Sequence, residues 1–109
     1  MRLPKSSKTR TLLNNGARGV VTTLGARGAE IVTADSTTTV PPYIVSPLDT
    51  TGAGDAFIGA LCAELTRGSS LEEAVCAAVI TGALATTVRG AVPSLPTRDI
   101  VTKARSALT

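Results

Sequence analysis

The sequence has no histidine and no tryptophan, and its aromatic side chains are one Phe and one Tyr. Without histidine, the chain lacks the commonest general base, the serine–histidine catalytic triad and most zinc sites. With so few aromatic rings it has little on which to stack bases, so we expect no nucleic-acid partner. The core must be built from Ala, Val, Leu and Ile, which bury less surface per residue than aromatic side chains.

Long apolar runs and cysteine pairs are also scarce. No run approaches the roughly 20 residues that span a bilayer, so we expect no membrane segment. Cys62 and Cys76 form no CxxC pair, and we expect small buried thiols in a reducing compartment rather than a disulfide. The first residues, Met1–Lys8, lack the apolar segment of a secretory signal. We therefore expect a cytoplasmic protein.

The charges are unevenly distributed along the chain. Residues 1–29 carry six basic and no acidic side chains, whereas residues 30–109 carry five basic and eight acidic ones. A basic start occurs in nucleic-acid-binding arms and in mitochondrial transit peptides, but an exposed lead-in is the simpler interpretation. We expect residues 1–12 to be a poorly ordered basic lead-in. The 109 residues fit one small domain or part of a larger one, and residues 13–109 are its folded part.

Residue patterning predicts strands in the first half of the chain. A helical turn is expected to end at Gly16. It is followed by a buried strand over Gly19–Leu24, a turn, and strands over Ala29–Thr33 and Thr37–Val40. Prolines interrupt the next stretch, so Tyr43–Val45 is predicted to be an edge strand or an extended segment.

The second half is predicted to be helical. One helix follows Asp55 and stops at Gly68, and a capping box of Ser70 and Glu73 opens the next, which runs to about Val88. That second helix is apolar on all sides, which predicts burial between layers. A last helix is predicted over Arg98–Ala107. Strands followed by helices indicate an α/β layer arrangement with one sheet face covered.

Chemistry is suggested by Gly52, Ala53 and Gly54, which precede the first of these helices. Small residues allow a ligand to approach the backbone, and the first turn of a helix offers unpaired N–H groups to an anion such as phosphate. A carboxylate at Asp55 would repel phosphate, so its expected role is general base for an attacking hydroxyl. The alternative interpretation is an ordinary N-capped helix with glycines in the turn.

The twelve residues Asp49–Ala60 (DTTGAGDAFIGA) resemble the C-terminal signature of the ribokinase-like carbohydrate kinases. The resemblance extends from about Leu13 to Ile100. It implies the C-terminal part of a three-layer α/β/α sandwich, with Asp55 as catalytic base that also contacts the substrate. It implies an anion hole made by the backbone of Gly52, Ala53, Gly54 and Asp55.

The segment Val20–Gly28 (VVTTLGARG) resembles the nucleotide loop of this family. Taken alone, it is typical of a hairpin turn, and its spacing before the DTTGAGD motif supports the nucleotide loop. The resemblance implies ATP-binding residues at Thr23, Leu24, Gly25, Ala26, Arg27, Gly28, Gly54 and Asp55.

The tail after Val88 (RGAVPSLPTRD) resembles the ending found in the ribokinase branch, which holds a monovalent cation. The resemblance implies K⁺ ligands at Asp49 and Ser94 and at the carbonyl groups of Thr51, Ala85, Val88 and Gly90. An oxygen-only set rich in neutral carbonyls suits a large, weakly charged ion. Without the resemblance, Asp49 and Ser94 would be ordinary loop residues.

The implied reaction is transfer of the γ-phosphoryl group of ATP to the 5-hydroxyl of ribose, with Mg²⁺ on the phosphates. The alternatives are another sugar or nucleoside kinase of the family, and a non-catalytic fragment or interaction module. Family members are longer, and their N-terminal part carries the sugar-binding residues and a lid that pairs subunits. We therefore expect a truncated kinase, inactive in isolation, whose full-length form is a homodimer.

Overall fold

The structure, a computed structural model, describes residues 7–88 and residue 101. The expected cation ligands Gly90 and Ser94 lie outside the described residues. So does the helix predicted over Arg98–Ala107, except for Val101, which is helical and 7% exposed.

The predicted strands form one antiparallel sheet in the order β1-β2-β3, made of β1 (Gly19–Thr23), β2 (Ala29–Thr33) and β3 (Thr37–Val40). The prediction of a buried first strand was wrong. The central strand β2 is the buried one, whereas β1 is half-buried over its first three residues and exposed at Thr22 and Thr23. An apolar run indicates that a segment favours a strand, but it does not indicate where the strand lies in the sheet. Because β1 is at the edge of the described sheet, it has a neighbouring strand on one side only and is less buried than β2.

The first helix, α1 (Ser7–Asn14), ends as predicted. Gly16 adopts a φ of 103°, and the Ala17 amide donates to the Leu12 carbonyl (3.1 Å), as in glycine-terminated helix ends. Residues 7–12, which we assigned to a poorly ordered lead-in, are helical here. Thr9 is 6% exposed, and α1 contacts β1.

The two long helices are α2 (Ala53–Thr66) and α3 (Leu71–Ala85). The predicted capping box is confirmed, because the Glu73 amide donates to Ser70 Oγ (3.1 Å) and the Ser70 amide donates to Glu73 Oε1 (3.4 Å). Helix α3 ends at Ala85, three residues before the predicted boundary. Thr86 and Thr87 hydroxyls donate to carbonyls three residues back, which tightens and ends the last turn.

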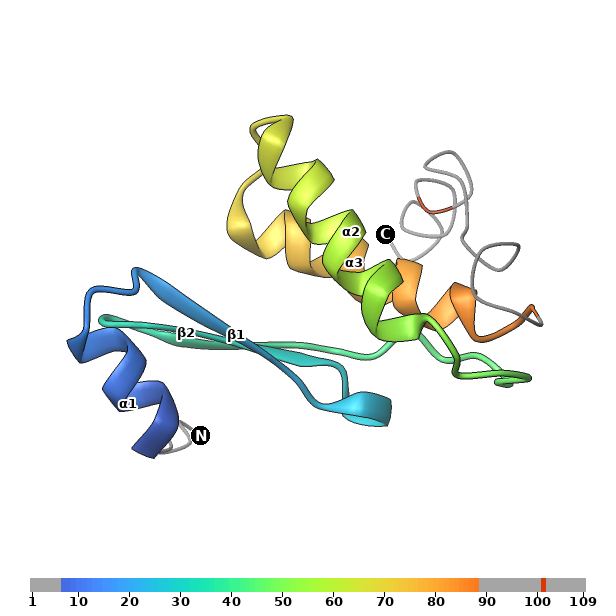
Figure 1. Ribbon diagram of the computed structural model, residues 1–109, viewed down its shortest axis with the longest axis horizontal. Coiled ribbons are helices and arrows are strands. Elements are labelled where there is room, and N and C mark those ends of the chain that lie inside the picture. The colour runs from blue at the N-terminus through green and yellow to red at the C-terminus, as the bar shows by residue number, and fades with distance from the viewer. Residues whose placement is uncertain (1–6, 89–100, 102–109) are drawn as a thin grey trace.

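Helices α2 and α3 pack on one side of the sheet, and α1 lies on the other (Figure 1). Helix α3 joins two apolar clusters, as expected for a helix that is apolar on all sides. Val75 and Ala78 pack with the sheet and Phe57, whereas Ala77 and Ile80 pack with Val101. Gly82 lets the helices approach closely, since a Cβ there would lie 3.3 Å from the Ala53 carbonyl oxygen.

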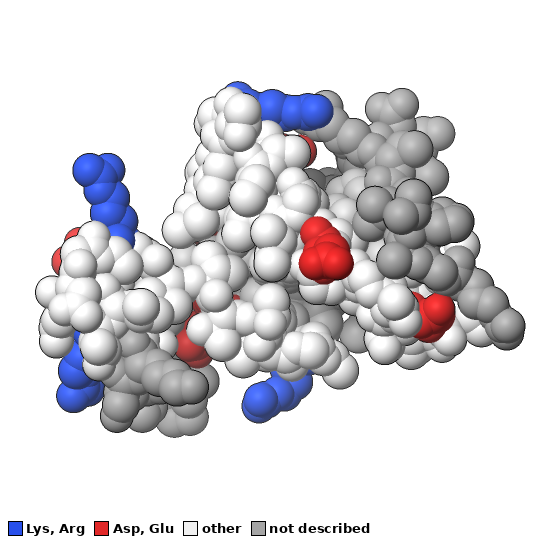
Figure 2. Space-filling view, viewed as in Figure 1, with Lys and Arg blue, Asp and Glu red and all other residues white. Residues whose placement is uncertain are grey.

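The expectation of buried cysteines differs from the structure. Cys62 is exposed on the outer side of α2 and Cys76 is half-buried, so neither is buried as expected, and both thiols are free. Tyr43–Val45, predicted to be an edge strand or an extended segment, lies outside the described strands. No described helix combines the length and apolar character needed to cross a bilayer. Charged side chains are scattered over the face shown in Figure 2, which is mostly uncharged.

Candidate phosphate-binding site

The start of α2 is a sharp turn built on glycine. Gly52 is the N-cap residue with a φ of 83°, a conformation that glycine adopts without steric cost. The Ala53 amide donates to the Thr50 carbonyl (3.2 Å), and the Ala56 amide donates to the Gly52 carbonyl (2.9 Å). The predicted small residues therefore stand at the transition from loop to helix.

Three backbone amides at this turn, those of Gly52, Gly54 and Asp55, have no acceptor within the described part of the chain. A Cβ added at Gly54 would meet nothing within 4 Å, so a ligand can approach the backbone there. Unpaired amides and the positive end of the α2 dipole favour an anion. Of the four amides expected in the anion hole, that of Ala53 donates to the Thr50 carbonyl, which leaves the other three as candidates.

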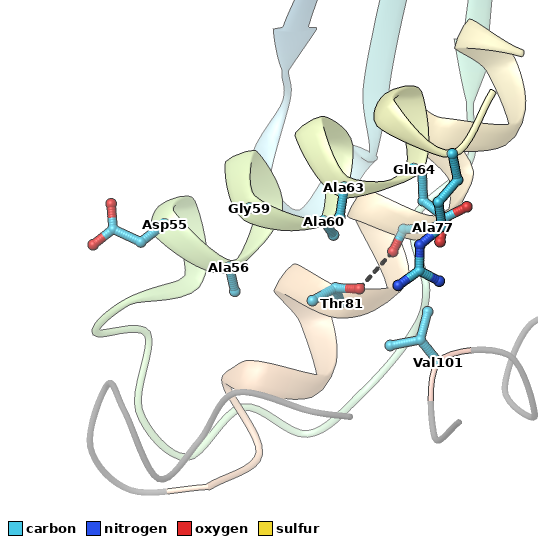
Figure 3. Close-up of a pocket in the computed structure, with 10 residues that line it drawn as sticks. Asp55, Ala56, Gly59, Ala60, Ala63, Glu64, Ala77, Thr81 and Val101 are labelled. Carbon is cyan, nitrogen blue, oxygen red and sulfur yellow. Dashed lines mark hydrogen bonds between the residues drawn. The ribbon is translucent and has the colours of Figure 1, made fainter. Parts of the chain in front are cut away.

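Asp55 lies in the first turn of α2, and its side chain is exposed. Figure 3 shows its carboxylate pointing away from the helix and from the other residues drawn. It makes no hydrogen bond within residues 7–88, so it is not a side-chain cap of α2. A carboxylate in this position can accept a proton from a hydroxyl group held beside a bound phosphate.

The predicted nucleotide loop is the connection between β1 and β2. It contains a short 3-10 turn, η1 (Gly25–Arg27), and is closed by a hydrogen bond from the Leu24 amide to the Gly28 carbonyl (2.8 Å). Gly25, Ala26 and Arg27 are exposed, Thr23 is exposed and Leu24 is half-buried. In Figure 1 this turn and the first turn of α2 project to the same end of the sheet.

Gly28 fixes this loop against β3. Its φ is 92°, and a Cβ there would lie 2.1 Å from the Val40 carbonyl oxygen and 2.9 Å from the Pro41 carbonyl carbon. Among the ATP-binding residues expected in the loop, Gly28 is buried. Its structural role is therefore to let the hairpin end cross the backbone that leaves β3.

Asp49 is held near the C-terminal end of α3. The amides of Leu48 and Asp49 both donate to the Thr86 carbonyl, at 2.6 and 2.9 Å, and Asp49 Oδ1 accepts from the Thr51 amide at 2.9 Å. The described residues include four of the expected cation ligands, Asp49, Thr51, Ala85 and Val88. The Thr86 carbonyl links the segment that holds Asp49 and Thr51 to the end of α3, where Ala85 and Val88 lie.

The donor chemistry at this junction fits a monovalent cation. Ala85 is fully buried, and its carbonyl receives no backbone N–H from the described residues. Carbonyl oxygens and one carboxylate suit a large ion of low charge. The described residues contain no cluster of three or more His, Cys, Asp or Glu side chains that could hold a metal ion.

A cavity of about 230 Å³ lies beside α2 and shares Asp55 with the anion turn. Four of its ten lining residues are alanines, and Glu64 and Arg67 also line it (Figure 3). The Thr81 hydroxyl in the wall is satisfied by the Ala77 carbonyl (2.8 Å). Because the wall is largely apolar, the cavity lacks the converging donors that a triphosphate requires, and the anion turn is the better candidate.

Comparison with models of protein families shows to which family this chain belongs. A model described as pfkB family carbohydrate kinase matches residues 5–98. The chain belongs to this family. The match begins before residue 13, where we placed the start of the folded part, and includes α1.

Proteins similar to this chain are named for different sugars. Fructokinase-1 of Oryza sativa subsp. japonica is 43% identical over 91 residues, which cover 77% of this chain and 28% of that protein. Deoxyribokinase of Salmonella typhi is 36% identical over 87 residues, covering 80% and 28%. The chain thus spans less than a third of the length of these relatives.

Solved structures confirm the predicted fold. Ribokinase from Thermotoga maritima superposes with a TM-score of 0.88 at 32% identity, over 95% of this chain and 35% of that one. A proposed ribokinase II from Escherichia coli in complex with ATP and Mg²⁺ gives 0.86 at 31%, with coverage of 95% and 35%. A fructokinase double mutant from Vibrio cholerae O395 with fructose, ADP and potassium gives 0.81 at 36%, with coverage of 91% and 34%.

Sequence reasoning missed the part that Thr86 takes in this site. Its contribution is a backbone carbonyl, which every residue type possesses, and its partners lie 37 and 38 positions earlier. No side-chain pattern in the sequence could have indicated a hydrogen bond to this carbonyl.

Proposed function

We propose that this chain is the nucleotide- and phosphate-binding part of an ATP-dependent sugar kinase. The observation that carries the proposal is the start of α2, where the amides of Gly52, Gly54 and Asp55, which have no acceptor among the described residues, adjoin an exposed carboxylate. Membership of a carbohydrate kinase family supports the same reaction class.

In the proposed mechanism, Asp55 accepts the proton of a sugar hydroxyl as its oxygen attacks the γ-phosphorus of ATP. The new P–O bond forms while the bond to the leaving ADP breaks, and the products are the sugar phosphate and ADP. The free amides donate to the phosphoryl oxygens, where charge is redistributed in the transition state. Mg²⁺ on the ATP phosphates supplies additional charge neutralisation.

The proposed ATP contacts are Thr23 to Gly28 in the β1–β2 connection, with Gly54 and Asp55. The proposed K⁺ ligands are Asp49, Thr51, Ala85, Val88, Gly90 and Ser94. Similar proteins solved with ATP and Mg²⁺, or with ADP and potassium, support these cofactors for the family. Cytoplasmic location and a homodimeric full-length form stay predictions.

Ribose is the proposed sugar, because the tail after Val88 resembles the ribokinase pattern. The relatives named fructokinase and deoxyribokinase keep fructose and deoxyribose as alternatives. A chain extended to the length of these relatives should be assayed with the three sugars in competition. Faster phosphorylation of fructose or deoxyribose than of ribose would reject ribose.

The reaction class is tested in a chimaera, in which this chain replaces the matching C-terminal third of the Vibrio cholerae fructokinase. The host part then supplies the sugar site, and fructose-dependent ADP formation is measured. We expect turnover that Asp55→Asn lowers about 10²- to 10⁴-fold, the usual contribution of a general base.

The matched control is Asp35→Asn, which removes an exposed carboxylate from the β2–β3 connection. We expect it to leave turnover within about twofold of the parent chimaera. A folded, fructose-binding chimaera without turnover would favour the non-catalytic alternative. A loss of kcat below about threefold in Asp55→Asn would remove Asp55 from the catalytic role.

A further inference from the structure

The segment between β3 and α2 carries the anion turn but has little side-chain anchorage near that turn. Leu48 is 59% exposed, and Thr50 and Thr51 are also exposed. Across residues 41–52, the segment has backbone hydrogen bonds to α2 itself, and within the described part of the chain its backbone hydrogen bonds to any other element are the two that reach Thr86. The position of the turn therefore depends strongly on that one carbonyl.

The Thr86 carbonyl has both of its lone pairs occupied. Leu48 N–H donates at 2.6 Å and Asp49 N–H at 2.9 Å. Asp49 also restrains the residue immediately before Gly52, because its Oδ1 accepts from the Thr51 amide. A continuous series of hydrogen bonds thus runs from the end of α3 to the start of α2.

The Thr86 side chain holds this carbonyl in place. Thr86 is 9% exposed, its hydroxyl donates to the Ala83 carbonyl at 2.6 Å, and its amide donates to the same carbonyl at 3.1 Å. Two bonds to one acceptor fix both the backbone and the rotamer of the residue that ends α3. Because its own carbonyl is already filled by two amides, Thr86 is suited to positioning rather than to binding a cation.

We propose that Thr86 is a positioning residue for phosphoryl transfer, which sets the location of the Gly52–Asp55 anion turn through its doubly accepting carbonyl. The proposal rests on the proposed kinase function for its catalytic consequence. Its structural part concerns this chain alone, so the two can fail separately.

The neighbouring Thr87 offers a matched control. Its hydroxyl donates to the Leu84 carbonyl at 2.7 Å and its amide to the same carbonyl at 3.0 Å, the same pattern one residue later. Its carbonyl accepts no hydrogen bond from the anion-turn segment. Thr86→Val and Thr87→Val therefore delete hydroxyls that make the same bond, although Thr86 is buried and Thr87 is exposed. Only the Thr86 carbonyl accepts from the anion-turn segment.

The structural test is amide hydrogen exchange of the 109-residue chain, followed residue by residue by NMR. We expect Thr86→Val to speed exchange at Leu48 and Asp49 by about fivefold, the factor that corresponds to the roughly 1 kcal/mol of one net hydrogen bond. Thr86→Ser keeps the hydroxyl and should restore slow exchange. Equal exchange at these two amides in Thr86→Val and Thr87→Val would overturn the proposal.

The catalytic test uses the chimaera. Thr86→Val should lower kcat by about fivefold with an unchanged KM for fructose, Thr86→Ser should restore it, and Thr87→Val should match the parent. Unchanged kcat in Thr86→Val would overturn the positioning role in an active enzyme. An inactive parent chimaera would instead contradict the proposed function, and the exchange experiment would still decide whether Thr86 holds the turn.

A second pair of variants serves if Thr86→Val does not fold. Leu48→Pro removes one of the two N–H donors at a position whose side chain is 59% exposed, and Leu48→Ala keeps the donor. Leu48→Pro should speed exchange at Asp49, and Leu48→Ala should not. The same exchange rate at Asp49 in both variants would count against the proposal.

Discussion

Replacing Gly28 by alanine should destabilise the chain strongly, and the structure allows the size of the effect to be worked out. Gly28 has a φ of 92° and a ψ of −132°, a conformation essentially confined to glycine, and forcing another residue into it costs about 1–3 kcal/mol. The new Cβ would also lie 2.1 Å from the Val40 carbonyl oxygen, where backbone must shift. Overpacking of this kind costs about 1–3 kcal/mol more.

Alanine also lowers the conformational entropy of the unfolded chain, which stabilises the folded state by about 0.4–1 kcal/mol. The net loss expected for Gly28→Ala is therefore about 1–6 kcal/mol, a large part of the total stability of a small domain. The control is Gly16→Ala, because Gly16 has a φ of 103° and a Cβ there meets nothing within 4 Å. It measures the cost of a positive φ without a steric contact.

The free energy of unfolding is measured by urea denaturation of both variants, followed by circular dichroism. We expect Gly28→Ala to be less stable than Gly16→Ala by about 1–3 kcal/mol, with unchanged slopes of the unfolding free energy against urea. Equal destabilisation in the two variants would show that the hairpin end does not press against the backbone leaving β3, and the description of the nucleotide loop would have to change.

Three further outcomes are expected. In the chimaera, potassium should activate turnover more than sodium or lithium at constant ionic strength, and Asp49→Ala should lower kcat and abolish the response to potassium; equal rates in the three salts would reject the cation site. The isolated 109-residue chain should show no ribose-dependent ADP release in a coupled assay, and robust release would contradict its interpretation as the phosphate-binding part alone. Ser70→Ala should lower the free energy of unfolding by about 1 kcal/mol in urea denaturation, because it removes the capping bond to the Glu73 amide, whereas a loss below about 0.3 kcal/mol would contradict that role.

Local chemistry was well predicted from the sequence. The capping box of Ser70 and Glu73 involves residues three positions apart, so it can form in any helix that starts there. Gly16 and Gly68 end their helices at φ values of 103° and 91°, a conformation that the sequence signals by glycine itself. Both features depend on neighbours in the chain rather than on the fold.

Burial was predicted less well, because it depends on which face of an element meets another. Helix α2 packs through Ala56 and Phe57, which are 4% and 9% exposed, whereas Ile58 is 59% exposed one residue later. Its residues are small or apolar on every side, so periodicity gives little indication of the inner face. Cys62 was therefore placed in the core although it lies outside.

The candidate site also has a part that depends on neighbours in the chain and a part that depends on the fold. The amides of Gly52, Gly54 and Asp55 and the Asp55 carboxylate lie within four consecutive residues, so a motif is enough to predict them. The position of that motif in the fold could not be predicted in this way. It is set by the hydrogen bonds that the Leu48 and Asp49 amides donate to the Thr86 carbonyl at the end of α3. Backbone carbonyls are common to all residue types, so the sequence could indicate the groups that would meet a phosphate but not the residue that holds them in place.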